Sequence, residues 1–135
     1  ITEYWQRPGQ TKINFAQGCL NTPPNLQGGF FDSTNGYWNV SNLVASPDAN
    51  TWYHLVTTYD GTTHTLKEYV NGTYIGETYC PGTPESWNPG LVIAKRWDAA
   101  DYLDCTIKVI NLWNGVILPE EVTYQKNLYT SGGLT

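Results

Sequence analysis

Charged residues are scarce in this chain of 135 residues: Asp, Glu, Lys and Arg together make up 14% of it, against roughly 25% in an average soluble domain. Its 7 basic side chains form no cluster, and its formal net charge is −5. A nucleic-acid partner, whose phosphates need neutralising, is therefore disfavoured, as is an anionic membrane surface. Because no apolar run approaches the length of about 20 residues that a bilayer span requires, we expect no membrane insertion.

Motifs of catalysis are also lacking. The sequence has no Gly-x-Ser-x-Gly elbow, no His-Glu-x-x-His or Cys-x-x-Cys, no glycine-rich phosphate loop, and only 2 histidines. Hydrolysis of a sugar linkage needs two carboxylates at a set separation, whereas most acidic residues here stand singly. Only Asp98, Asp101 and Asp104 cluster, apart from Glu120 and Glu121. We therefore predict that the chain is not an enzyme and has no catalytic residues.

The chain length corresponds to one domain, which we place at residues 1–130, followed by a flexible tail at 131–135. It begins at Ile1, in a segment that already has the composition of a strand, so we expect it to be a piece of a longer chain or assembly. Cys19, Cys80 and Cys105 are an odd count, so at most one intrachain disulfide can form. Their pairing stays open at this point.

Aromatic and turn-forming residues are abundant, with 6 Trp, 10 Tyr, 13 Gly and 8 Pro. This composition favours strands and tight reversals, so the predicted class is all-β. Strand-like segments recur at short spacing, and the pairs Asn35-Gly36, Asp60-Gly61 and Asn71-Gly72 predict hairpin turns between them. The predicted strands are 1–6, 12–17, 29–32, 37–41, 51–59, 64–70, 73–79, 91–97 and 104–113.

Two of the predicted elements have a more specific expectation. Segment 51–59 has apolar side chains on both parities, which is typical of a central strand that is covered on both faces. Segment 118–128 is the one predicted helix, with Pro119 in its first turn and Val122, Gln125 and Tyr129 on one face. We expect this helix to cap one end of the fold.

The run from Trp52 to Gly61, followed by Glu68-Tyr69-Val70-Asn71-Gly72, resembles the laminin-G-like pattern of a Trp and a His that open a strand, an Asp-Gly turn and a Tyr-Val-Asn-Gly hairpin. Residues 107–113 followed by Leu118-Pro119-Glu120-Glu121-Val122 resemble the last strand and helix of that family. The resemblance implies an antiparallel two-sheet β-sandwich, a jelly roll of the concanavalin-A-like kind. In it we expect Trp52 and Tyr69 to fill the core, and His54 to order a strand or bond a neighbouring backbone.

The candidate binding region is the long connection from Pro81 to Asp104. Aromatic rings there could stack on sugar rings while amide and charged groups hold hydroxyls, although the same residue types also dominate protein interfaces. Shielding of the core by these aromatics is the structural alternative. The predicted ligand-binding residues are Trp87, Asn88, Arg96, Trp97, Asp98 and Tyr102.

No cofactor or metal is expected, because a solvent-exposed turn explains Asp98, Asp101 and Asp104 better than a site for Ca²⁺ does, although their oxygens could ligate that ion. The predicted function is that of a non-catalytic lectin-like module for carbohydrate recognition or adhesion, at an extracellular, cell or virion surface. The alternative is a structural or interaction domain displayed on a virion, fibre or cell-surface protein. The predicted partner is accordingly a glycan or a protein surface.

Overall fold

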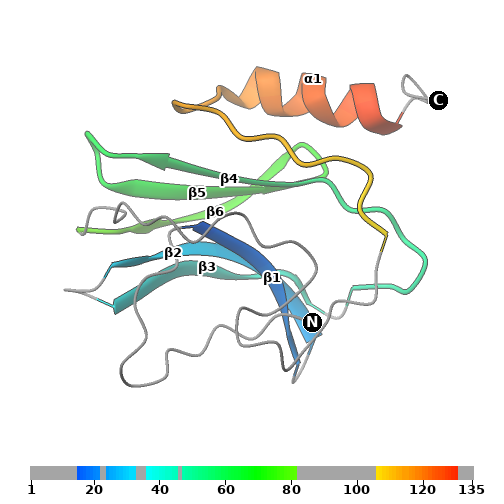
Figure 1. Ribbon diagram of the computed structural model, residues 1–135, viewed down its shortest axis with the longest axis horizontal. Coiled ribbons are helices and arrows are strands. Elements are labelled where there is room, and N and C mark those ends of the chain that lie inside the picture. The colour runs from blue at the N-terminus through cyan, green and yellow to red at the C-terminus, as the bar shows by residue number, and fades with distance from the viewer. Residues whose placement is uncertain (1–14, 22–23, 33–35, 46, 82–105, 131–135) are drawn as a thin grey trace.

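The computed structural model describes residues 15–21, 24–32, 36–45, 47–81 and 106–130. These residues form six strands and one helix, and the strands belong to two antiparallel sheets of three (Figure 1). The elements are β1 (Phe15–Asn21), β2 (Pro24–Asp32), β3 (Gly36–Ala45), β4 (Leu55–Asp60), β5 (Thr65–Val70), β6 (Thr73–Tyr79) and α1 (Pro119–Thr130). The predicted all-β antiparallel class with a C-terminal helix is therefore confirmed.

The first sheet has the order β1-β2-β3. Its second hairpin is the one that Asn35-Gly36 predicts, since Asp32 pairs with Gly36. Strand β1 continues past its predicted end at residue 17 to Asn21, and β2 begins at Pro24 and not at residue 29, because the glycines and prolines of this region resemble turn residues in the sequence. Strand β3 likewise continues past its predicted end at residue 41 to Ala45. Pro24 is tolerated as the first residue of β2, and the register shift between Leu26 and Gly28 is the kind of bulge that glycine often marks.

The second sheet has the order β4-β5-β6 and forms the predicted meander. At the β5–β6 turn, Asn71 and Gly72 have φ angles of 51° and 80°, as a two-residue hairpin requires. At the β4–β5 turn the left-handed residue is His64, with a φ of 53°, and not Gly61. The Asp60 carboxylate holds this turn, since its Oδ1 accepts a hydrogen bond of 2.8 Å from the backbone N–H of Thr62.

Three expectations for segment 51–59 differ from the structure of the described residues. The strand begins only at Leu55, and Trp52 before it is 60% exposed instead of lying in the core, because the chain at 47–53 turns on itself through the Tyr53 hydroxyl and the Asp48 N–H. Among the described strands β5, not β4, is central. Apolar side chains occur on both parities of β4 because both faces of its sheet are covered.

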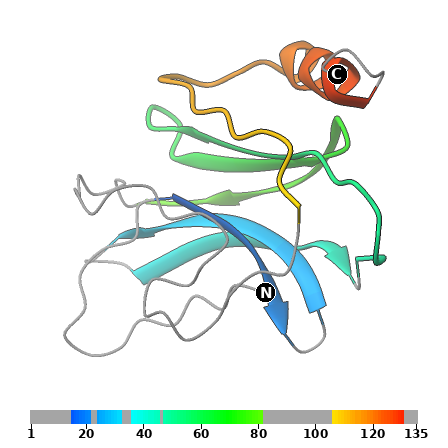
Figure 2. The same ribbon diagram turned by 45° about the vertical axis from the view of Figure 1, so that its right-hand side comes forward.

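Sheet β4-β5-β6 lies between α1 and sheet β1-β2-β3 (Figures 1 and 2). On the helix side, Val122 of α1 is fully buried against Val56 and Tyr69, so Tyr69 is the core residue that the sequence predicts. On the opposite side, Leu66 and Cys80 are fully buried. The helix therefore covers a face of the sheet and not an end of the fold, although Pro119 and the predicted Val122 face are correct.

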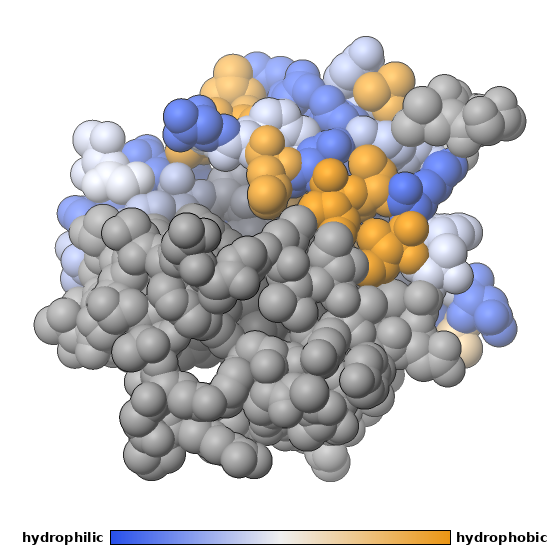
Figure 3. Space-filling model, in the orientation of Figure 1, coloured by the Kyte–Doolittle hydropathy of each residue, from blue (hydrophilic) through white to orange (hydrophobic). Residues whose placement is uncertain are grey.

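Residues 106–113 form no strand, which contradicts that part of the prediction for 104–113. The segment is tied to the end of α1 instead: Lys108 Nζ donates to the carbonyl oxygen of Tyr129 at 3.2 Å, and the Asn111 amide donates to the Tyr129 hydroxyl at 2.8 Å. Its apolar side chains are consequently exposed, and Figure 3 shows apolar side chains gathered where this segment passes. The predicted strands 1–6 and 91–97 lie outside the described residues.

Candidate functional site

The predicted ligand-binding residues, Trp87, Asn88, Arg96, Trp97, Asp98 and Tyr102, all lie outside the described residues. The structure shows where the connection that carries them departs. The backbone N–H of Cys80 donates to the carbonyl oxygen of His64 at 2.7 Å, which holds the end of β6 against the β4–β5 turn. The described surface beside this departure point is the helix-side face of β5 and β6.

Four side chains on that face form a surface that we call the tyrosine strip: Lys67 on β5, and Tyr74, Glu77 and Tyr79 on β6. They occupy successive rows of the β5–β6 ladder, in which Tyr69 pairs with Tyr74, Lys67 with Glu77, and Thr65 with Tyr79. Tyr74 and Tyr79 are 49% and 64% exposed. The strip therefore presents two aromatic rings to solvent with two charged groups between them.

Each exposed ring of the strip is held by a second ring. Tyr79 meets His64 with the ring centroids 6.2 Å apart and an interplanar angle of 78°. Tyr74 meets the buried Tyr69 at 5.7 Å and 66°. Edge-to-face contacts of this kind are favourable for aromatic pairs. They restrict the orientation of both rings before any ligand arrives, which lowers the entropic cost of binding.

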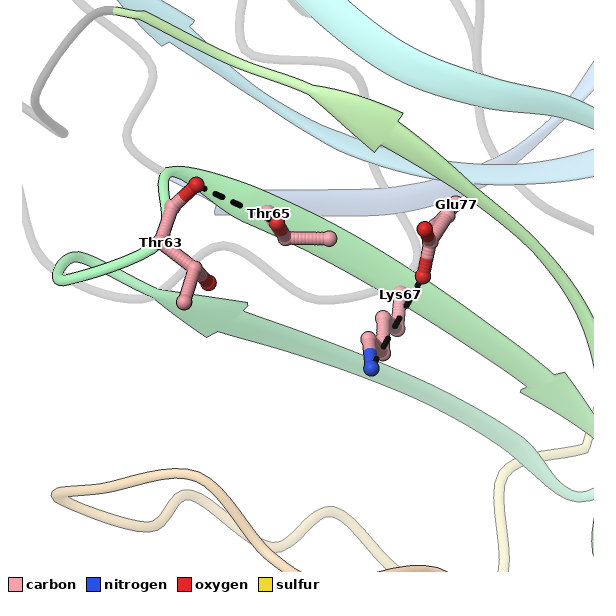
Figure 4. A network of polar contacts seen from close by, with 4 residues as sticks. All are labelled: Thr63, Thr65, Lys67 and Glu77. Atoms are coloured by element: carbon pink, nitrogen blue, oxygen red, sulfur yellow. Dashed lines mark hydrogen bonds and ion pairs between the residues drawn. The ribbon is translucent and has the colours of Figure 1, made fainter.

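Polar groups fill the space between the two rings. Lys67 Nζ and Glu77 Oε2 are 3.7 Å apart and form an ion pair across β5 and β6 (Figure 4). Partial desolvation raises the pKa of the Tyr74 hydroxyl, and hydrogen bonding to the Glu77 carboxylate raises it further. Ring faces stack on the C–H faces of sugars, while ammonium, carboxylate and hydroxyl groups bond to sugar hydroxyls.

A different carboxyl group lies on the opposite face of β5. Glu68 is fully buried, and its Oε2 accepts a hydrogen bond of 3.0 Å from the Thr57 hydroxyl. Its Oε1 has no hydrogen-bond partner among the residues that the structure describes. Burial raises the pKa of Glu68 from its usual 4.5 to about 8, and the Thr57 hydrogen bond opposes this only in part. At neutral pH the group is mainly uncharged.

His54 bonds to the β5–β6 turn through its backbone, whereas the Nδ1 of its imidazole is buried and has no hydrogen-bond partner among the described residues. Its backbone N–H donates to Asn71 Oδ1 at 2.9 Å, and the Asn71 N–H donates to the His54 carbonyl oxygen at 2.8 Å, so the residue joins the start of β4 to the β5–β6 turn. Burial lowers the pKa of the His54 imidazole, and the positive charge of Lys126 on α1 lowers it further. The ring therefore stays neutral at pH 7.

Sequence reasoning missed the tyrosine strip for a definite reason. Side chains alternate between the two faces of a regular strand, so Tyr74 and Tyr79, which are five positions apart, are expected on opposite faces. A register shift beside Glu68 and Tyr69 skips Ile75 and brings both tyrosines to the same face. Gly76, next to that shift, is the one signal in the sequence that could have indicated the bulge.

No three His, Cys, Asp or Glu side chains within the described ranges gather closely enough to hold a metal ion. Nor does any helix in the same ranges have the length and apolar character needed to cross a bilayer. Cys80 is a free buried thiol, and burial raises its pKa to about 11.

Comparison with known proteins gives one family and one similar solved structure. No curated protein sequence matches the chain significantly. The crystal structure of an S-layer domain-containing protein (residues 221–444) from Clostridium thermocellum is similar with a TM-score of 0.52 and 15% identity, over 92% of this chain and 67% of that one. This likeness concerns the fold alone. The sequence model of the concanavalin A-like lectin/glucanases superfamily, of the laminin-G type, matches residues 11–123, and the chain therefore belongs to that superfamily.

Proposed function

We propose that this chain is a non-catalytic surface module that recognises carbohydrate. The observation that carries the proposal is the tyrosine strip, in which two exposed and pre-oriented rings flank the Lys67–Glu77 ion pair. Membership of a superfamily of lectins and glucanases agrees with a saccharide ligand. The predicted residues in 82–105, with Trp87 and Trp97 foremost, remain part of the proposed site because their connection departs beside Tyr79.

The non-catalytic part of the proposal is supported by the positions of the described carboxyl groups. Glu68 has a raised pKa, as a general acid often does, but it is fully buried and faces away from the tyrosine strip. Glu77 is exposed and already engaged by Lys67. Glycoside hydrolysis needs two carboxyl groups on either side of one substrate bond, and these two lie on opposite faces of the sheet. We further propose that binding needs no cofactor and no Ca²⁺.

The second candidate function is a structural or interaction domain in a larger surface assembly. It is favoured by the fold-level likeness to an S-layer domain-containing protein and by the exposed apolar side chains of residues 106–118. Both candidates imply an extracellular or surface location. Both also assume the complete two-sheet jelly roll, including a strand within 91–97, which we propose from the family.

A glycan array followed by calorimetry, each with Ca²⁺ and with EDTA, tests the proposed function. We expect a saccharide ligand whose affinity is the same in both buffers and falls in Trp87→Ala or Trp97→Ala. Trp52→Ala is the control, because Trp52 is an exposed Trp that precedes β4 and lies outside both the tyrosine strip and the connection 82–105. If no saccharide on the array binds, the chain is not a lectin-like module, and the structural function takes its place.

A further inference from the structure

We infer that the tyrosine strip binds an uncharged, linear saccharide along β6 and contacts internal sugar units of the chain, not a terminal sugar alone. This inference rests on the proposed carbohydrate-binding function and specifies its ligand class. It depends on three features of the strip, which are its length, its fixed rings and its balanced charge.

The length of the strip exceeds one sugar ring. The rows that carry Tyr74 and Tyr79 are separated by the four residues from Tyr69 to Thr65 on β5, which at roughly 3.3 Å per residue is about 13 Å. A single pyranose ring is much shorter than that, so one sugar can contact Tyr74 or Tyr79 but not both. A chain of linked sugars that runs parallel to β6 contacts both rings.

The fixed rings favour an extended ligand. His64 and Tyr69 contact the two exposed rings at steep interplanar angles, and these contacts limit the rotation of Tyr79 and Tyr74. Both rings stay accessible, and they lose less rotational freedom on binding than free side chains would. When one saccharide contacts both rings, binding to the second ring is intramolecular, as in a bivalent ligand. Affinity should therefore rise steeply once the saccharide is long enough to span both.

The charges between the rings select an uncharged ligand. Lys67 and Glu77 carry opposite charges and neutralise one another at 3.7 Å. An acidic sugar would meet the Glu77 carboxylate and the negative net charge of the whole chain. A protein partner is also disfavoured, because the centres of protein interfaces are depleted in charged residues, whereas Lys67 and Glu77 occupy the centre of this strip.

The test uses isothermal titration calorimetry with linear β-1,4-linked glucose and mannose oligosaccharides of one to six units, and tetragalacturonate as the acidic counterpart. We expect affinity for at least one neutral series to rise by tenfold or more between one unit and four, and tetragalacturonate not to bind. Tyr79→Ala and Tyr74→Ala should each lower affinity for the tetrasaccharide about tenfold. Tyr79→Phe, which keeps the ring, should retain most of it.

The controls separate this inference from the proposed function. Tyr124→Ala removes an equally exposed tyrosine from α1 and should change nothing, and thermal unfolding of each variant verifies folding. If a saccharide binds with an affinity that ignores chain length and both tyrosine substitutions but depends on Trp97, the strip is not the site and the proposed function stands. If no saccharide binds, or if only a protein ligand does, both this inference and the proposed function are wrong.

Glu77→Gln, which removes the carboxylate that faces Lys67, should allow tetragalacturonate to bind. If tetragalacturonate still does not bind, the Lys67–Glu77 pair does not select for uncharged ligands.

Discussion

At the scale of single residues, Glu68 has the most unusual environment in the described part of the chain. It is fully buried, and the Thr57 hydroxyl is its one side-chain hydrogen-bond partner among the residues that the structure describes. Strands β1, β2 and β3 contain no Lys, Arg or His in their sequences. An ionised carboxylate is costly in such a place, so folding favours the protonated form. The folded protein should therefore bind a proton at pH values where the unfolded chain has lost it.

This difference predicts that the protein is less stable at pH 8 than at pH 5. With a pKa of 4.5 unfolded and about 8 folded, the contribution of Glu68 is complete below pH 4.5 and is lost by pH 8, which amounts to at most about 5 kcal/mol. Glu68→Gln cannot ionise and should flatten this dependence and stabilise the protein at pH 8. Urea unfolding at pH 5 and at pH 8 measures the free energy of unfolding of each variant, and Glu77→Gln, at an exposed position, is the control. If the free energy of unfolding changes equally with pH in wild type and in Glu68→Gln, Glu68 is not a buried carboxyl that stays protonated in the folded protein.

At the scale of elements, the two hairpin turns of sheet β4-β5-β6 look equivalent in sequence and differ in structure. Both contain an acidic or amide residue followed by glycine, yet only Gly72 has a positive φ, of 80°. Gly72→Ala should lower the free energy of unfolding by about 1 to 2 kcal/mol because an L side chain is disfavoured there. In Gly61→Ala the added Cβ would lie 3.7 Å from Tyr59 Cε1, an ordinary contact. Thermal unfolding should therefore show a lower melting temperature for Gly72→Ala and almost no change for Gly61→Ala.

Helix α1 depends on its contact with the sheet more than on its own sequence. Val122 is fully buried against Val56 and Tyr69, while Tyr124 two positions later is exposed. Val122→Ala should destabilise the protein by about 1 to 3 kcal/mol through the lost contacts and the resulting cavity. Tyr124→Ala should leave stability within about 0.5 kcal/mol. Denaturant unfolding measures both, and comparable losses in the two variants would show that the helix does not pack as described.

At the scale of the whole molecule, the three layers of helix, sheet and sheet should open together. Cys80 reports on this, because its thiol is fully buried beside Leu66 at the end of β6 and burial raises its pKa to about 11. We expect iodoacetamide to label Cys80 only as fast as the protein unfolds globally, with the same urea dependence. Mass spectrometry of the proteolytic peptides distinguishes Cys80 from Cys19 and Cys105. A labelling rate of Cys80 that does not change with urea concentration would indicate local opening of β6 instead.

The sequence by itself determined the class, the meander and the helix. Turn pairs such as Asn71-Gly72 and the apolar face at Val122 depend on local backbone preference and periodicity, which neighbouring residues largely decide. It also led to the superfamily through Trp52 to Gly72, even though Trp52 itself is exposed and outside the core.

Only the tertiary structure decided which side chains share a surface. Residues 106–113 have strand-like composition but form no strand, since a strand exists only where a neighbour provides the hydrogen bonds of a ladder. A bulge that skips Ile75 brings Tyr74 to the face of Tyr79, and so produces the tyrosine strip. Alternation along a strand can be counted from the sequence, but a register shift depends on pairing with β5, which a single strand does not contain.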